Sequence, residues 1–139
     1  MRLELPSPGS PGDWLRYARS DLALAGAGVR AEVLVESLCY HAQQAAEKSL
    51  KAVLVHYGQV PPRTHSLTAL ADALSSILRI PPEIQDAAAL TAYAVMARYP
   101  IEHEPITEAE YREALRLATA VVTWAEEAIR GTDADATTL

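Results

Sequence analysis

The stretch from Cys39 to Gly58, CYHAQQAAEKSLKAVLVHYG, decides the fold of this chain. It has no glycine or proline before Gly58, and it is rich in the strong helix formers alanine, leucine, lysine and glutamate. Extended back to about Ala31, its apolar residues recur every three or four positions, which is the spacing of a buried helix face. In the middle of that face lie small residues that let a second helix approach closely: Ala42, Ala45, Ala46 and Ser49. We therefore predict the central helix of a small bundle.

The opposite face of this helix is polar, with Gln43 and Glu47 among its residues, and Glu47 is expected to have a structural role in an ion pair. Glu47 and Lys51 stand in the favourable i,i+4 order for an ion pair. Four side chains share one side of the helix within three turns, and we predict that they bind a nucleotide or RNA: His41, Gln44, Lys48 and Lys51. The alternative is a solvated face or a dimer rim, with Lys48 in an ion pair to another helix.

Two segments come before the central helix. Residues 1–12 contain three prolines and are predicted to form a flexible arm. Asp13 is the expected N-cap of a first helix that ends near Ala27. In that helix, Arg16, Arg19 and Asp21 are expected on a solvated face.

Three further helices are predicted after Gly58. The third begins after Thr64 or Ser66, and the fourth runs from Pro82 or Glu83 to Arg98. The fifth opens with a capping box at residues 107–110 and closes at Gly131, which leaves residues 132–139 as a disordered tail. The predicted fold is all-α: a five-helix, up-and-down bundle over residues 13–131.

Composition limits the possible functions. The chain has 139 residues, half of them hydrophobic, which suits one domain with its own core. Its net charge is −6 and it has no basic run, so any contact with RNA must be local. Cys39 is the single cysteine and is predicted to be a buried, unreactive thiol. We find neither a signal peptide nor a run of membrane-spanning length and expect a cytoplasmic protein that does not enter the membrane.

Three blocks of the sequence together resemble the HEPN domain family, over roughly residues 13–130. They are residues 43–52 followed by Gly58, the run Thr64-His65-Ser66-Leu67, and the run Arg98-Tyr99-Pro100. The resemblance implies a small helical bundle that forms homodimers. It also implies a partner, because genes of this family are commonly paired with a minimal nucleotidyltransferase in a toxin–antitoxin-like module.

Arg98 and His103 are the candidate catalytic residues. Their R-x4-H spacing is similar to that of the ribonuclease members of the family. An imidazole can move the proton of a ribose 2′-hydroxyl while a guanidinium holds the phosphate, so no metal or cofactor is needed. The resemblance further implies that two such pairs face each other in a homodimer, and Tyr99 is a candidate contact to RNA.

Two other interpretations remain open from the sequence. Arg98 could instead interact with the end of its helix, with Tyr99-Pro100 as a packed turn, and the dimer would then be a non-catalytic module that binds a nucleotide or a partner protein. The chain could also be a helical protein without a ligand. His65 is most simply a residue at the N-terminus of the third helix. The run from Glu102 to Glu104 lacks the spacing of a metal site.

Overall fold

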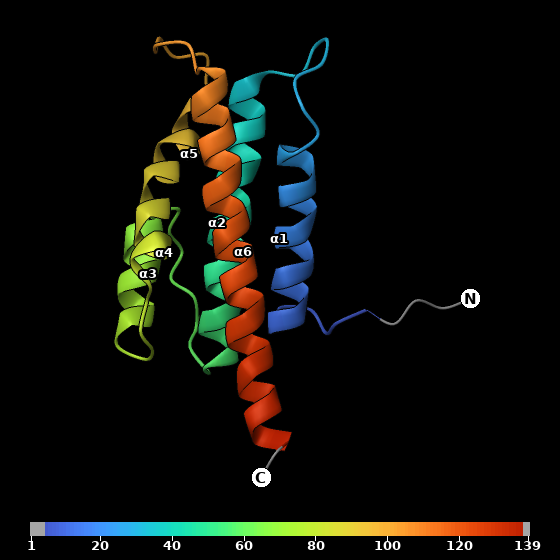
Figure 1. Ribbon diagram of the computed structural model, residues 1–139, viewed down its shortest axis with the longest axis vertical. Coiled ribbons are helices and arrows are strands. Elements are labelled where there is room, and N and C mark those ends of the chain that lie inside the picture. The colour runs from blue at the N-terminus through green and yellow to red at the C-terminus, as the bar shows by residue number, and fades with distance from the viewer. Residues whose placement is uncertain (1–4, 138–139) are drawn as a thin grey trace, which may run out of the picture.

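The computed structural model describes residues 5–137, and this part of the chain contains helices and no strand (Figure 1). The helices are α1 (Pro11–Ala25), α2 (Val35–His56), α3 (Leu67–Ser75), α4 (Pro82–Asp86), the 3-10 helix η1 (Ala87–Ala92), α5 (Tyr93–Met96) and α6 (Glu108–Thr137). Counted with α4, η1 and α5 as one interrupted segment, they are the five predicted helices. The all-α bundle is confirmed.

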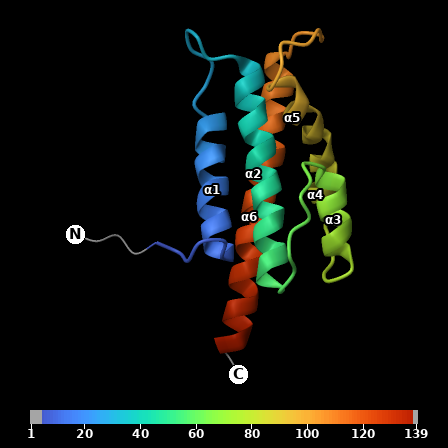
Figure 2. The same cartoon turned by 180° about the vertical axis from the view of Figure 1, so that it is seen from behind.

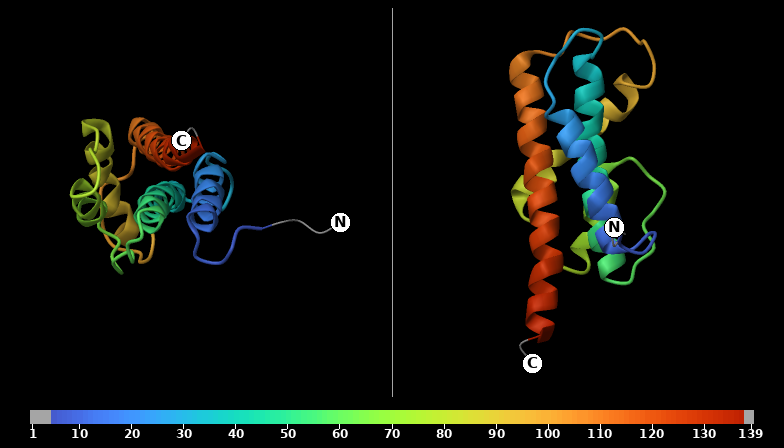
Figure 3. Two further views of the ribbon diagram at one scale, coloured as in Figure 1. Left: turned by 90° about the horizontal axis from the view of Figure 1, so that it is seen from below. Right: turned by 90° about the vertical axis from the view of Figure 1, so that its right-hand side faces the viewer.

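Helix α2 lies at the centre of the bundle. Seen from below, it has α1 and α6 on one side and the group α3 to α5 on the other (Figure 3). Helices α1 and α2 run in opposite directions (Figures 1 and 2). The segment from α4 to α5 runs toward the end of the bundle where α6 begins (Figures 1 and 2). The connector at residues 59–66 passes along α2 before α3 starts (Figure 2). Every other helical group therefore packs around α2.

The core follows the predicted apolar stripe. Ala42, Ala45 and Ala46 of α2 are fully buried, as the close approach of neighbouring helices requires. Around them the other elements contribute buried aliphatic side chains, among them Leu15, Leu70, Leu74, Leu90, Leu117 and Val121. The hydroxyl of Tyr111 donates to the carbonyl oxygen of Ala25, which ties the first turn of α6 to the last turn of α1. No described helix is long and apolar enough to cross a membrane.

The predicted fourth helix is interrupted. The chain tightens into a 3-10 helix at Ala87–Ala92 between α4 and α5. This tight turn keeps Leu90 in the core and brings Thr91 to the start of α3, where its hydroxyl oxygen accepts a hydrogen bond from the Leu67 amide at 3.2 Å. These two tertiary contacts accompany the departure from the α-helix that the local sequence favours.

Three helix ends differ from the predictions. Helix α1 starts earlier, because Ser10 rather than Asp13 caps it and accepts a hydrogen bond from the Asp13 amide at 3.2 Å. Helix α2 starts later, at Val35. Helix α6 passes Gly131 and continues to Thr137, since no proline follows to stop it. Residues 1–4 of the predicted arm and residues 138–139 of the predicted tail lie outside the described part of the chain.

Cys39 is buried in α2, as predicted. Burial raises the pKa of its thiol to about 11, and the nearby carboxylates of Glu36 and Glu110 act in the same direction. The thiol therefore stays protonated near neutral pH, where a nucleophilic cysteine would need to be a thiolate.

The central position of α2 predicts a large penalty for shortening its core side chains. Leu50 is 1 % exposed, so Leu50→Ala should lower the free energy of unfolding by about 2–5 kcal/mol. The matched variant Leu24→Ala, at a position 48 % exposed on α1, should cost much less. Urea denaturation of both variants measures the difference. Equal losses would contradict the assignment of α2 as the centre of the core.

Candidate functional site

The polar face of α2 is buried, so the alternative of a solvated face does not hold for most of its residues. Gln43 is fully buried, and Gln44 and Glu47 are less than one tenth exposed. The connector covers this face: the amide nitrogen Nε2 of Gln43 donates to the backbone carbonyl of His65 at 3.2 Å. A sequence periodicity cannot show that a non-helical segment will pack over a polar stripe.

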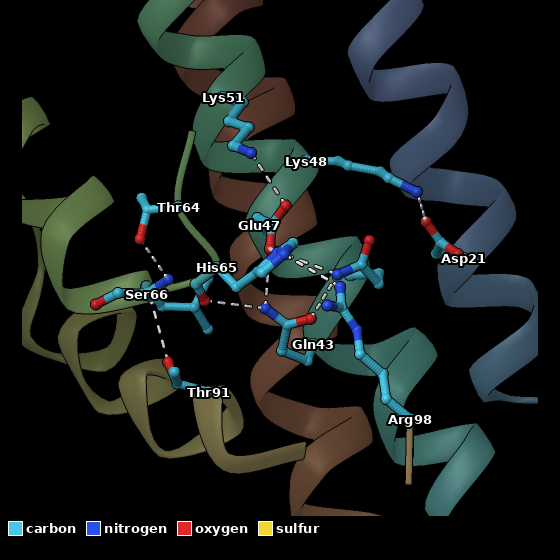
Figure 4. Close-up of polar contacts among 12 residues, drawn as sticks. Asp21, Gln43, Glu47, Lys48, Lys51, Thr64, His65, Ser66, Thr91 and Arg98 are labelled. Atoms are coloured by element: carbon cyan, nitrogen blue, oxygen red, sulfur yellow. Dashed lines mark hydrogen bonds and ion pairs between the residues drawn. The ribbon is translucent and has the colours of Figure 1, made fainter. Parts of the chain in front are cut away.

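Glu47 is the centre of a hydrogen-bond network (Figure 4). Its Oε1 accepts from His65 Nδ1 at 2.8 Å and from Gln43 Nε2 at 3.1 Å, and its Oε2 accepts from Lys51 Nζ at 3.1 Å. Gln44 adds a bond of 2.7 Å from its Nε2 to Gln43 Oε1. The predicted ion pair between Glu47 and Lys51 is confirmed. One carboxylate thus gathers donors from α2 and from the connector.

The pKa of Glu47 shows that these donors outweigh the cost of burial. Burial by itself raises the pKa of this carboxyl group, but hydrogen bonds from His65, Gln43 and Lys51 together hold it below its ordinary value. Glu47 is therefore ionised near neutral pH, although it is only 4 % exposed.

His65 links the buried Glu47 to the surface residue Arg98. An ionised carboxylate can only accept, so Nδ1 of His65 carries the proton that is donated to Glu47. The other ring nitrogen, Nε2, lies 3.1 Å from a terminal nitrogen of the Arg98 guanidinium, which can only donate. These two contacts match a ring protonated at Nδ1 alone, and the three side chains form a chain of hydrogen bonds from α2 across the connector to the turn after α5.

The backbone around His65 is held on both sides. Thr64 accepts a hydrogen bond from the Ser66 amide at 3.0 Å, and Ser66 caps α3 by accepting from the Ala69 amide at 3.2 Å. Together with the bond from Gln43 to the His65 carbonyl, these contacts fix where the imidazole leaves the connector. The sequence indicated only the capping function of this segment.

A second cluster joins α2 to α1. Asp21 accepts from His41 Nδ1 at 2.8 Å and also pairs with the Lys48 ammonium. The predicted ion pair of Lys48 with another helix is thereby confirmed, but the prediction that Asp21 is solvated is wrong, because Asp21 is 7 % exposed. The sequence carried a signal for this: Asp21 stands three residues after Ala18 and four before Ala25, within the buried stripe of α1.

The four α2 residues predicted to bind a nucleotide therefore divide into two groups. His41 and Lys48 contact Asp21, whereas Gln44 and Lys51 belong to the network around Glu47. Lys51 also lies 5.7 Å from the ring centre of Trp14, and Lys48 lies 5.9 Å from that of Tyr17. Much of the positive charge on this face is balanced by buried carboxylates.

Arg98, Tyr99 and His103 line one pocket of about 270 Å³, together with residues from the start of α2. Tyr99 is 62 % exposed and its ring is free to contact a ligand. His103 Nδ1 donates to the carbonyl oxygen of Glu104 at 2.8 Å, which leaves Nε2 of the neutral ring as an acceptor. The hydrogen bond drawn from the Arg98 guanidinium goes to His65 (Figure 4). In the described part of the chain, no three His, Cys, Asp or Glu side chains are placed to share a metal ion.

Comparison with known proteins assigns the family. A family model described as the HEPN domain matches residues 12–128, so the chain belongs to the HEPN domain family. Its fold is similar to that of TT1696 from Thermus thermophilus, at 32% sequence identity and a TM-score of 0.76 over 86% of this chain and 98% of that one. It is also similar to ST0689, an archaeal HEPN homologue, at 28% identity and a TM-score of 0.68 with the same coverage. No curated protein matches significantly.

The depressed pKa of Glu47 predicts an acid-sensitive contribution to stability. Glu47→Gln keeps the shape of the side chain but removes its charge, and near pH 7 it should lower the free energy of unfolding by about 1–3 kcal/mol. The stabilisation requires an ionised carboxylate, so the difference between parent and variant should shrink as the pH falls below 4.5, the ordinary pKa of glutamate. Urea denaturation across this range measures it.

Glu113→Gln is the matched control, because Glu113 pairs with Arg116 at the surface, where each side chain is more than half exposed. This variant should unfold almost as the parent does. A Glu47 variant that behaves like the Glu113 variant would contradict the central place given to Glu47.

Proposed function

We propose that this HEPN protein is a metal-independent endoribonuclease that acts as a homodimer through Arg98 and His103. The observation that carries the proposal is the pocket of about 270 Å³ that Arg98, Tyr99 and His103 line together. A guanidinium for the phosphate, an aromatic ring for a base and an imidazole for proton transfer are what RNA cleavage at a ribose 2′-hydroxyl needs.

In the proposed reaction, His103 Nε2 takes the proton of the 2′-hydroxyl. The oxygen then attacks phosphorus and the bond to the 5′ oxygen breaks, which gives a 2′,3′-cyclic phosphate. Arg98 balances the charge that develops on the phosphoryl oxygens. The leaving 5′ oxygen takes a proton from a protonated His103 in the second protomer, which is why the proposal includes a homodimer.

The proposal extends to a partner. We place this chain as the helical half of a toxin–antitoxin-like module in the cytoplasm, with a minimal nucleotidyltransferase as the other half. The net charge of −6 supports a need for a partner or for locally placed cations, because the protein as a whole repels RNA.

A non-catalytic module is the second candidate, and one observation favours it. Arg98 donates to His65 rather than to any group of the His103 loop that the structure describes. In this alternative the same dimer presents Arg98 and Tyr99 to a nucleotide or to the nucleotidyltransferase without cleaving RNA.

Cleavage of a mixed RNA pool by the purified protein in the presence of a chelator decides between the two. The parent should cut RNA, and His103→Ala should be slower by at least about a hundredfold, because it lacks the group that moves the proton. His56→Ala is the matched control. His56 is the last residue of α2, whereas the pocket is lined by residues at the start of α2, so this variant should cleave RNA as the parent does. A folded, dimeric parent that leaves RNA intact would favour the non-catalytic module.

A further inference from the structure

The need of the buried Glu47 for donors explains the contact of His65 Nδ1, but it does not explain the contact of Nε2 with Arg98. The His65 side chain is 50% exposed, so it fills little of the core, yet each ring nitrogen has a specific partner. Glu47 Oε1 lies 2.8 Å from Nδ1 and the Arg98 guanidinium lies 3.1 Å from Nε2. A buried carboxylate that orients an exposed imidazole beside an arginine is an arrangement suited to binding an anion.

We infer that His65 Nε2 and the Arg98 guanidinium together bind a phosphate group, with Glu47 orienting the imidazole. The inference rests on the proposed function in that it uses the same Arg98, and it adds His65 as a second ligand-binding group. The ligand is either a phosphodiester of single-stranded RNA or the phosphate of a free nucleotide, because both present the same oxygens.

Local charge supports an anion at this position. Three ionisable groups besides His65 take part in this site. Glu47 and Arg98 contact the His65 ring, and Lys51 contacts Glu47. With neutral His65 these sum to one net positive charge, on a chain whose net charge is −6. Gln43 and Gln44 are neutral: Gln43 donates a hydrogen bond to Glu47, and Gln44 donates one to Gln43. The guanidinium has five N–H donors and uses one of them on His65, so others can reach a phosphate.

Binding should take up one proton. Phosphate oxygens accept hydrogen bonds, whereas Nε2 of the neutral ring is itself an acceptor toward Arg98. For His65 to donate to the phosphate, Nε2 must gain a proton from solvent and release its bond from Arg98. The ring then carries a positive charge between the phosphate and the Glu47 carboxylate, and Arg98 is free to donate to the phosphate as well.

The test is isothermal titration calorimetry with three probes: inorganic phosphate, adenosine monophosphate, and a short single-stranded RNA with 2′-O-methyl groups that block cleavage. Each titration is run in two buffers that differ in ionisation enthalpy, which reports protons taken up on binding. We expect at least one probe to bind with net proton uptake. Preference for the RNA or for the mononucleotide distinguishes the two sources of phosphate.

His65→Asn is the decisive variant, because the asparagine amide can still donate to Glu47 but has no group in place of Nε2. It should keep a melting temperature close to that of the parent, bind the same probe at least about tenfold more weakly, and bind it without proton uptake. His56→Asn makes the same substitution at the end of α2 and should bind like the parent.

Several outcomes would overturn the inference. They are a parent that binds none of the probes, a parent that binds without proton uptake, and a His65→Asn variant that binds as the parent does. The first two need no variant, so a folding defect in His65→Asn cannot hide the answer. If the parent does not cleave RNA but its phosphate binding depends on His65, only the ribonuclease proposal is contradicted. If the parent cleaves RNA and His65→Asn binds the probes as the parent does, only the phosphate-binding role of His65 is contradicted.

Discussion

The ionised carboxylate of Glu47 constrains this structure more than any other polar group. Transfer of an unpaired carboxylate into a protein interior is very costly, so a side chain that is 4 % exposed must be surrounded by donors. Gln43 and Lys51 come from its own helix, and His65 comes from the connector. The connector must therefore cross α2 at one place, and His65 in turn holds Arg98.

This constraint turns the middle of α2 into the meeting point of the bundle. On one side, the network around Glu47 reaches the turn after α5 (Figure 4). On the other side, Asp21 of α1 holds His41 and Lys48. In the cluster on α1, Asp21 balances the charge of Lys48. In the network around Glu47, Lys51 and Arg98 leave one net positive charge on an acidic protein. Such local placement is how a chain without a basic run can offer a site for phosphate.

Much of the fold could be predicted from the sequence, because the apolar stripe of α2 and the proline and glycine stops are local signals. The interruption at Ala87–Ala92 could not, since it depends on a contact between Thr91 and the start of α3. Within the candidate site, the R-x4-H spacing indicated Arg98 and His103, which do share a pocket. The pairing of His65 with Glu47 spans 18 residues and a non-helical connector, and no periodicity reports such a contact.

The most direct test of this account is the tautomer of His65, measured by long-range nitrogen–proton NMR correlation on the uniformly labelled protein without phosphate. We predict a neutral ring protonated at Nδ1, because Glu47 accepts from that nitrogen and Arg98 donates to the other. Glu47→Gln should weaken this preference. A neutral His65 protonated at Nε2, the form favoured by free histidine, would show that Glu47 does not orient the ring and would contradict the account.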